Sequence, residues 1–192
     1  ERSVCVLERG REIPAGAFPD TLASAAWQVQ VRRGARRFGR ATGLFDLRAG
    51  DDLSVVVGCG LGGTSLINAG VALRPKPWVY DDRWPAELRG EHNGPIELAP
   101  YFERAERMLG SAPFPDTWVE PTKLAVLRKA AEATKDTVTR PPINVTFADG
   151  PNAAGIEQRA CNQCGDCVSG CNHRAKNTVT ENYLPDAVAH GA

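Results

Sequence analysis

The sequence lacks the features that mark a membrane-spanning, nucleic-acid-binding or disordered chain. No apolar run approaches the roughly 18 residues of a membrane span, so we expect no transmembrane segment. The 23 basic residues equal the 23 acidic ones, and this zero net charge argues against a broad nucleic-acid-binding surface. The hydrophobic fraction of 42% is too high for a disordered chain. These absences leave a folded domain that binds neither a bilayer core nor nucleic acid.

Methionine is nearly absent as well, and Met108 is the only one. No positively charged segment followed by an apolar stretch opens the chain, so no secretory signal is visible. The location of the protein is therefore not fixed, although four cysteines grouped within residues 161–171 favour a reducing compartment such as the cytoplasm. The 192 residues suit one domain and can bury a core without a disulfide framework.

Hydrophobic spacing predicts a small number of helices and strands. Residues 3–8 are apolar nearly throughout and end in an acid, which predicts a short buried strand. A second strand is predicted over residues 53–57, where three β-branched residues follow one another. Amphipathic spacing predicts helices over residues 98–109 and 121–135, the second with Leu124, Leu127 and Ala131 on one face. Residues 140–160 are rich in loop-forming residues.

A basic run places five arginines within residues 32–40. It could form a phosphate-facing patch. The alternative that we favour is a solvated loop whose charge is partly offset by Asp46, Asp51 and Asp52.

A glycine-rich turn follows the second predicted strand. Residues 58–63 match the pattern G-x-G-x-x-G and lead into a predicted helix, and Thr64 and Ser65 add hydroxyl donors. Glycines without a Cβ let the backbone approach a pyrophosphate, and a helix N-terminus offers unpaired N–H donors. Glycine-rich turns also serve packing alone, so the pattern leaves both interpretations open.

The order of the motifs does not fit one Rossmann unit that begins at residue 53. Such a unit needs a second buried strand, ending in an acid, about 20 residues after the glycines. Residues 78–85 hold two adjacent acids but no apolar run, whereas the acid-tipped segment lies upstream and ends at Glu8. A carboxylate in that place suits the hydroxyls of a ribose. We therefore interpret Glu8 and the glycine-rich turn as two parts of one nucleotide site, and we expect the first strand and its own glycine turn to precede residue 1.

Taken together, residues 4–10 and 60–70 resemble the FAD-binding half of the glucose-methanol-choline (GMC) oxidoreductases, and in particular their cholesterol-oxidase-like branch. Four further segments match in the expected order: residues 82–85, 101–106, 170–178 and 182–185. The resemblance implies an α/β fold, namely a partial FAD-binding Rossmann-like domain with loop-rich and helical insertions. That incomplete domain would occupy residues 1–192, with the catalytic C-terminal half of the family beyond them.

The resemblance also implies roles for individual residues. Glu8 would hold the adenosine ribose of FAD. The turn residues would lie along the pyrophosphate and flavin: Gly60, Gly62, Gly63, Thr64 and Ser65. Asn68 and Val71 would approach the isoalloxazine ring, and Gly70 would let the chain pass close to it. The catalytic base of the family lies downstream of this chain, and none of its three histidines has the matching context, so no catalytic residue is assigned: His92, His173 and His190.

The most distinctive local pattern is the cysteine segment C-x2-C-x2-C-x3-C, formed by Cys161, Cys164, Cys167 and Cys171. Thiolates at these spacings can surround an iron–sulfur cluster, and the run matches a bacterial ferredoxin segment except that Asn172 replaces the final proline. Zinc is a second candidate. Because the resembling family carries out its chemistry with FAD alone, structural thiols become the favoured interpretation.

Three functions of different classes remain. The favoured one is part of an FAD-dependent oxidoreductase that oxidises an alcohol, a sterol or another hydrophobic alcohol, by hydride transfer to the flavin, with dioxygen or another compound as electron acceptor. The second is an iron–sulfur electron-transfer module built on the cysteine segment. The third is a nucleotide-binding domain without catalysis.

Overall fold

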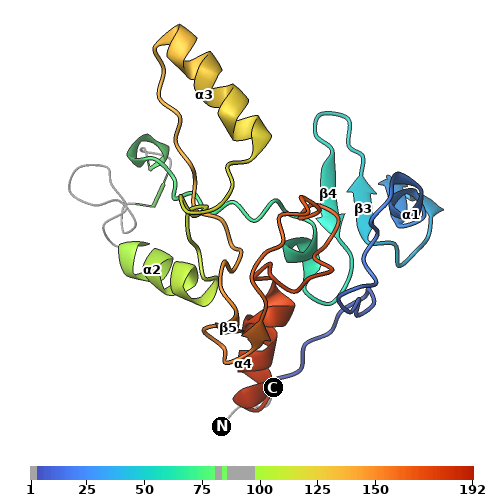
Figure 1. Ribbon diagram of the computed structural model, residues 1–192. Coiled ribbons are helices and arrows are strands. Elements are labelled where there is room, and N and C mark those ends of the chain that lie inside the picture. Colours follow the sequence, from blue (N-terminus) through green and yellow to red (C-terminus); the bar gives the residue numbers. More distant parts are fainter. Residues whose placement is uncertain (1–3, 81–83, 86–97) are drawn as a thin grey trace.

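The computed structural model of the protein describes residues 4–80, 84–85 and 98–192 (Figure 1). The N-terminal half contains one short helix and four strands: α1 (Leu22–Ala26), β1 (Val29–Arg33), β2 (Arg36–Gly39), β3 (Phe45–Arg48) and β4 (Val55–Gly58). Two 3₁₀ helices follow: η1 (Gly63–Leu66) and η2 (Pro77–Val79). The C-terminal half contains three helices, a short hairpin and a further 3₁₀ turn: α2 (Ala99–Met108), α3 (Thr122–Thr134), β5 (Gly150–Pro151), β6 (Glu157–Gln158), η5 (Val179–Glu181) and α4 (Tyr183–Ala189).

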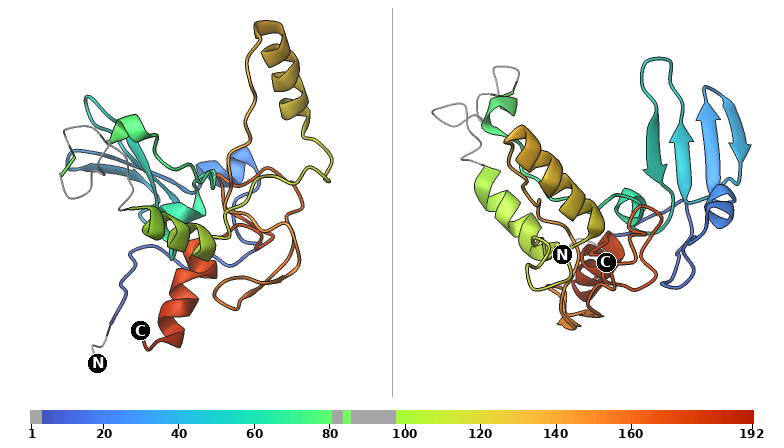
Figure 2. Two further views of the ribbon diagram at one scale, coloured as in Figure 1. Left: turned by 90° about the vertical axis from the view of Figure 1, so that its left-hand side faces the viewer. Right: turned by 45° about the horizontal axis from the view of Figure 1, so that its top comes forward.

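The first four strands form one mixed sheet in the order β2-β1-β3-β4 (Figure 2, right). Strands β1 and β3 are parallel, and the two outer pairs are antiparallel. The chain is therefore a mixed α/β fold, as the sequence predicts. Strand β4 also confirms the predicted strand over residues 53–57, although it begins and ends slightly later.

The basic run is not the loop that the sequence predicts. Strands β1 and β2 form a hairpin across it, with Arg33 opposite Arg36 and Gly34 in the left-handed region of the two-residue turn, at φ 55°. A tight turn with a positive φ allows the strands to continue directly into each other. The expected charge compensation is present, because Arg33 pairs with Asp51 at 3.3 Å and Arg32 pairs with Asp46 at 3.0 Å. Asp46, however, is fully buried and not on a solvated loop.

Two further predictions about local structure are wrong. Residues 4–8 form no strand and are exposed, with Leu7 90% accessible. A buried strand needs neighbours for its backbone hydrogen bonds, and no strand of the described residues pairs with this segment. The helix expected after the glycines is the single 3₁₀ turn η1. Gly62 and Gly63 have φ values of 107° and 58°, which a right-handed helix does not allow.

The apolar core is small and lies where the sheet meets η1. Phe18, Leu44, Leu66 and Ile67 form it, with partly buried side chains packed against them. Much of the remaining interior is polar, and its members are these: Gln30, Asp46, Gln158, Lys176, Asn177, Thr178 and Asn182. Buried polar groups are usually hydrogen-bonded, and the side chains of Lys176 and Asn182 are. Among the described residues, the side-chain oxygens of Gln158 and Asn177 have no such partner.

The two predicted long helices are present as α2 and α3. Helix α3 extends away from the sheet (Figure 1), and Ala131 is its only buried residue. Leu127, which the sequence places on a buried face, is 54% exposed. Near the loop before α3, the rings of Phe114, Trp118 and Phe147 pack edge to face.

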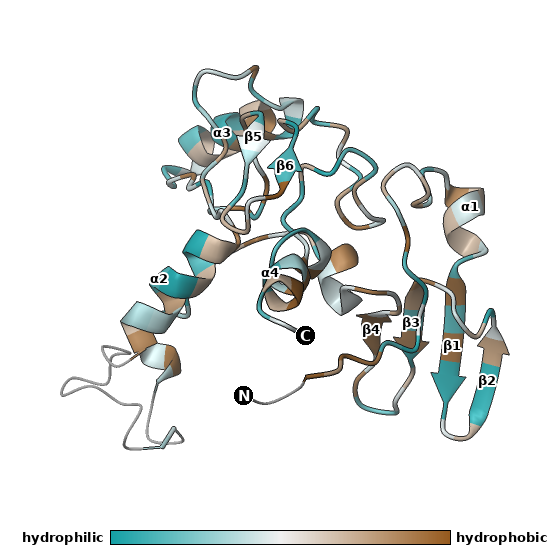
Figure 3. Cartoon of the chain, turned by 90° about the horizontal axis from the view of Figure 1, so that it is seen from below, coloured by the Kyte–Doolittle hydropathy of each residue, from teal (hydrophilic) through white to brown (hydrophobic). Residues whose placement is uncertain are grey.

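Strand β4 is hydrophobic along most of its length (Figure 3). Within the part of the chain that the structure describes, no helix is both long and apolar enough to cross a membrane.

Candidate cofactor site

The N-terminal segment and the glycine-rich turn meet, although about fifty residues separate them in the sequence. A Cβ on Gly10 would lie 2.3 Å from the backbone nitrogen of Gly60, so the two backbones touch without a side chain between them. The N–H of Leu61 donates to the carbonyl of Arg11 at 3.0 Å. Glu8 lies two residues before this contact, and its exposed carboxylate accepts from the N–H of Gly10 at 2.5 Å. The structure thus brings together the two parts that the sequence assigns to one site.

The glycines of the turn are required for two different reasons. A Cβ on Gly58 would lie 2.3 Å from the carbonyl oxygen of Gly63, so packing alone excludes a side chain there. Gly63 has open space around its missing Cβ, and its left-handed backbone makes glycine the favoured residue. The packing interpretation of the motif therefore accounts for Gly58 but leaves a side-chain-free, open surface at Gly63.

The two hydroxyls that follow the glycines differ in their contacts. The hydroxyl of Thr64, which is exposed, accepts from the N–H of Gly58 at 3.2 Å. Ser65 donates to the carbonyl of Gly62 at 2.6 Å and accepts from the N–H of Val179 at 3.0 Å. The hydroxyl hydrogen of Ser65 is therefore used inside the protein, and this residue joins the turn to η5.

In the next segment, residues 68–71, Gly70 is buried, whereas the side chains of Asn68 and Val71 are exposed. Gly70 is buried at φ 72°, and its carbonyl accepts from the N–H of Asn144 at 2.7 Å. Asn68 is exposed, with its side-chain oxygen accepting from the N–H of Gly70 at 3.1 Å, and Val71 is 50% exposed. Asn68 and Val71 are therefore open to a ligand, whereas Gly70 serves the fold.

A buried lysine links this segment to the cysteine segment. The ammonium of Lys176 donates to the carbonyls of Leu66, Asn68 and Cys167 at 3.1, 2.6 and 2.8 Å. Burial lowers the pKa of Lys176 to about 8, opposed by the nearby thiols of Cys167 and Cys171. The sequence offers no sign of this role, because lysine is among the residues least often buried.

Asn172, which stands where a ferredoxin segment has proline, fastens the cysteine segment to the N-terminal region. Its side-chain oxygen accepts from the N–H groups of Gly16 and Phe18, each at 2.9 Å, and its amide donates to the carbonyl of Phe18 at 3.1 Å. A proline could make none of these contacts. Asn172 therefore joins, by hydrogen bonds, two segments that are more than 150 positions apart in the sequence.

The four cysteines receive no support as a metal site. In residues 4–80, 84–85 and 98–192, no group of three or more His, Cys, Asp or Glu side chains is arranged to hold a metal ion. Burial raises the pKa of Cys161 and of Cys167, with Lys176 lowering the latter and the N–H of Gln163 lowering the former. All four are free thiols.

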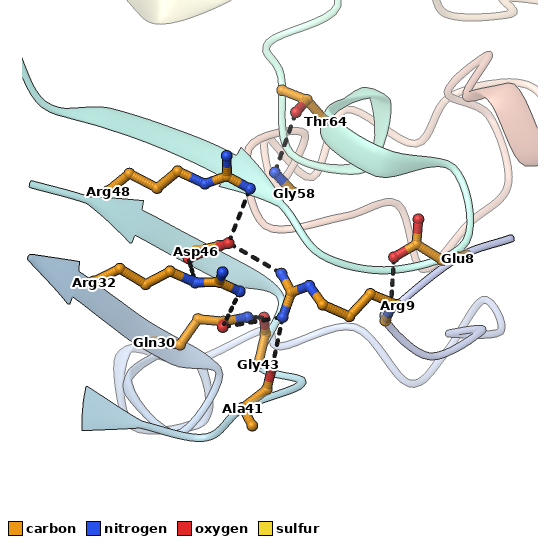
Figure 4. A network of polar contacts seen from close by, with 11 residues as sticks. Glu8, Arg9, Gln30, Arg32, Ala41, Gly43, Asp46, Arg48, Gly58 and Thr64 are labelled. Carbon is orange, nitrogen blue, oxygen red and sulfur yellow. Dashed lines mark hydrogen bonds and ion pairs between the residues drawn. The ribbon is translucent and has the colours of Figure 1, made fainter. Parts of the chain in front are cut away.

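Asp46 organises a charged network beneath the N-terminal segment (Figure 4). Its fully buried carboxylate lies 3.0 Å from a guanidinium nitrogen of Arg9, 3.0 Å from that of Arg32 and 3.4 Å from that of Arg48. Sequence reasoning missed this group and treated Asp46 as a surface charge. The available signal was an acid between apolar residues in the run 44–47, which β3 largely occupies.

Comparison with known proteins identifies the family of the chain. A family model described as GMC oxidoreductase matches residues 23–192. The chain therefore belongs to the GMC oxidoreductase family, whose cofactor is FAD.

Two features of the sequence analysis lie outside the residues that the structure describes. They are His92 and part of the segment 82–85 that resembles the family.

Individual relatives point in the same direction. The chain is 30% identical over 205 residues to a cholesterol oxidase of Mycobacterium tuberculosis (strain CDC 1551 / Oshkosh), covering 98% of this chain and 33% of that protein. A cholesterol oxidase of Acinetobacter baumannii is 30% identical over 207 residues, covering 99% and 35%. An uncharacterized GMC-type oxidoreductase of M. tuberculosis (strain ATCC 25618 / H37Rv) is 29% identical over 197 residues, covering 98% and 26%. The chain thus spans about a third or less of the curated relatives it matches.

Proposed function

We propose that this chain forms part of the FAD site of an FAD-dependent oxidoreductase that oxidises an alcohol, with a sterol or another hydrophobic alcohol as substrate. The observation that carries the proposal is the contact between Gly10 and Gly60, which places Glu8 beside the glycine-rich turn. When bound, FAD supplies the hydride acceptor for this chemistry.

The residues present fit the nucleotide half of FAD. Glu8 is an exposed carboxylate at the end of its segment, and it is suited to accept hydrogen bonds from the two ribose hydroxyls. The turn offers backbone without a side chain and with open space at Gly63, where a pyrophosphate could approach the main chain. Gly60 is buried against Arg11, and Gly62 packs close to Leu66. Thr64 adds an exposed hydroxyl, while Ser65 holds the turn in shape through its bond to Val179.

The flavin end of the site would involve the segment from Asn68 to Val71. Both of these side chains are exposed, so an amide and an apolar side chain are accessible in this segment. The ammonium of Lys176 donates to the carbonyl of Asn68, and this hydrogen bond limits the movement of the Asn68 backbone. Preorganised groups of this kind orient a cofactor without reorganisation when the substrate binds.

The substrate class rests on the relatives, two of which are named cholesterol oxidase. FAD held by Glu8 and the glycine-rich turn would supply the acceptor for the hydride of the carbinol carbon, with the hydroxyl proton going to a base and dioxygen or another compound as final electron acceptor. We assign the role of catalytic base to no residue of this chain.

The test uses the full-length protein. We expect it to purify with, or take up, one flavin that shows two resolved absorption bands, and anaerobic cholesterol should bleach the longer-wavelength band. Replacing Glu8 with glutamine should weaken FAD binding about tenfold, since a charge-assisted hydrogen bond contributes roughly 1.5–3 kcal/mol. A protein that neither contains nor binds FAD would contradict the proposal. Bound FAD that cholesterol leaves oxidised would contradict the sterol substrate only.

A further inference from the structure

We infer that Arg9, held by the buried carboxylate of Asp46, is a positioning residue that fixes Glu8 for the ribose of FAD. The inference rests on the proposed function. Its starting point is that Asp46 is fully buried, and an isolated carboxylate is not stable in such a place unless cations compensate it. Here, three arginines contact a single carboxylate.

Two of these arginines belong to the sheet, and one does not. Arg32 lies on β1 and Arg48 on β3, the strand that carries Asp46 itself, so both stand where strand register puts them. These two cations already exceed the charge of the carboxylate. Arg9 comes from the N-terminal segment, which forms no strand. Its presence at Asp46 is therefore not needed to neutralise the buried acid, and it calls for another explanation.

The guanidinium of Arg9 is fastened on three sides. One nitrogen donates to the carbonyl of Ala41 at 2.8 Å and to the side-chain oxygen of Gln30 at 3.3 Å, and the other donates to Asp46 at 3.0 Å (Figure 4). Gln30 is itself oriented, because its amide donates to the carbonyl of Gly43 at 2.8 Å. A planar guanidinium can serve three acceptors in fixed directions, which a lysine ammonium cannot reproduce.

In the sequence, Arg9 lies between Glu8 and Gly10, the two residues of this segment that form the candidate site. Glu8 precedes Arg9, and Gly10, which touches the backbone of Gly60, follows it. On the far side the segment is held by the bond from Leu61 to the carbonyl of Arg11. On the near side Val4, Val6 and Leu7 are all more than half exposed and give little hold. Arg9 is thus the side-chain anchor adjacent to Glu8. The Glu8 carboxylate also accepts from the N–H of Gly10 at 2.5 Å, and the loss of Arg9 should loosen the backbone that carries both groups and so free the direction of that carboxylate.

The test measures flavin affinity in the full-length apoprotein by fluorescence titration with FAD and, separately, with FMN. FMN lacks the adenosine ribose that Glu8 would hold. We expect Arg9→Met to weaken FAD binding about tenfold while leaving FMN binding within about twofold, because a lost charge-assisted contact is of that size. Arg9→Lys, which keeps the charge but not the fork, should fall between wild type and Arg9→Met and covers the case in which Arg9→Met does not fold.

The matched control is Arg33→Met. Arg33 lies on β1, next to Arg32, and like Arg9 it pairs with an aspartate. Its partner is Asp51, at 3.3 Å, and both side chains are largely exposed. We expect this variant to bind FAD and FMN as the wild type does. A double variant then tests the route: Glu8→Gln combined with Arg9→Met should bind FAD no more than about twofold more weakly than Glu8→Gln alone, because a residue that acts through Glu8 has nothing left to position.

The outcomes separate the inference from the proposed function. Equal losses of FAD and FMN affinity in the Arg9 variants, additive losses in the double variant, or no loss at all would each overturn the positioning role. A wild-type protein that binds no FAD would overturn the proposed function and the inference with it.

Discussion

At the scale of single residues, this protein depends on polar side chains that are buried and satisfied. Lys176 is 2% exposed and Asn182 is fully buried. The ammonium of Lys176 donates to carbonyls of two segments that lie far apart in the sequence, at Leu66 and at Cys167. A buried polar group that keeps its partners specifies one arrangement of the chain around it. The consequence is that a conservative-looking change at such a position should alter more than local packing.

Lys176 should make stability depend on pH in a particular direction. Its pKa is lowered to about 8 in the folded protein, from 10.5. Below pH 8 the lysine is charged in both states and the folded state bears the full cost of burying the charge. Between about 8 and 10.5 the unfolded chain binds more protons, so stability rises with pH. Relative to Lys176→Met, the wild type should gain up to about 3 kcal/mol in unfolding free energy across this window.

Urea unfolding of both proteins at several pH values measures this difference. The comparison is needed because the raised pKa values of Cys161 and Cys167 have the opposite effect, a loss of stability as pH rises through the ordinary thiol range. A difference between the two proteins that stays constant from pH 7 to pH 11 would contradict the account.

At the scale of elements, the structure relies on side chains that join loops. Asn172 makes three hydrogen bonds to the backbone of residues 16–18. Gly170 permits this contact, because a Cβ there would lie 2.0 Å from the ring of Phe18. The cysteine segment is thus packed against the N-terminal region through a glycine and an asparagine, with the thiols taking no part in either contact.

Asn172→Ala should therefore destabilise the protein by about 2–3 kcal/mol, since each of its hydrogen bonds contributes roughly 0.5–1.5 kcal/mol. Asn162→Ala is the matched control, because the exposed Asn162 accepts only from the N–H of Cys164, at 3.2 Å. It should cost less than about 1 kcal/mol. Denaturant unfolding measures both changes, and equal effects of the two substitutions would argue against the cross-link.

Elements with strong periodicity could be predicted, and those fixed by distant partners could not. The helices α2 and α3 follow the amphipathic spacing of their sequences. Strands β1 to β3 were not predicted because their segment has weak hydrophobic periodicity and a run of arginines. Two of these arginines, Arg32 and Arg33, form ion pairs with aspartates. The apolar run before Glu8 predicts a strand that is absent, since a strand depends on neighbours that no local pattern reveals. The order of the motifs predicted that the segment of Glu8 and the glycine turn belong together, and the two segments do meet; the contacts of Arg9 with Asp46 were not predicted.

At the scale of the whole molecule, FAD should be the cofactor and the cysteines should hold no metal. Among the residues that the structure describes, no group of three or more His, Cys, Asp or Glu side chains is arranged to hold a metal ion. The purified protein should contain well under one equivalent of iron or zinc, and treatment with EDTA should leave its unfolding midpoint unchanged. Elemental analysis and thermal unfolding measure these. Stoichiometric iron with a broad brown absorption shoulder would instead support the iron–sulfur alternative.

The lysine that joins Leu66 and Asn68 to Cys167 also has a consequence for the order of folding during synthesis. The glycine-rich turn is made early, yet one of its supports is a side chain 110 residues later. Contacts between such distant residues form slowly and leave earlier segments exposed in the meantime. On the ribosome, the cofactor region should therefore stay unfinished until the segment around Lys176 has emerged, and flavin should not be acquired before that point.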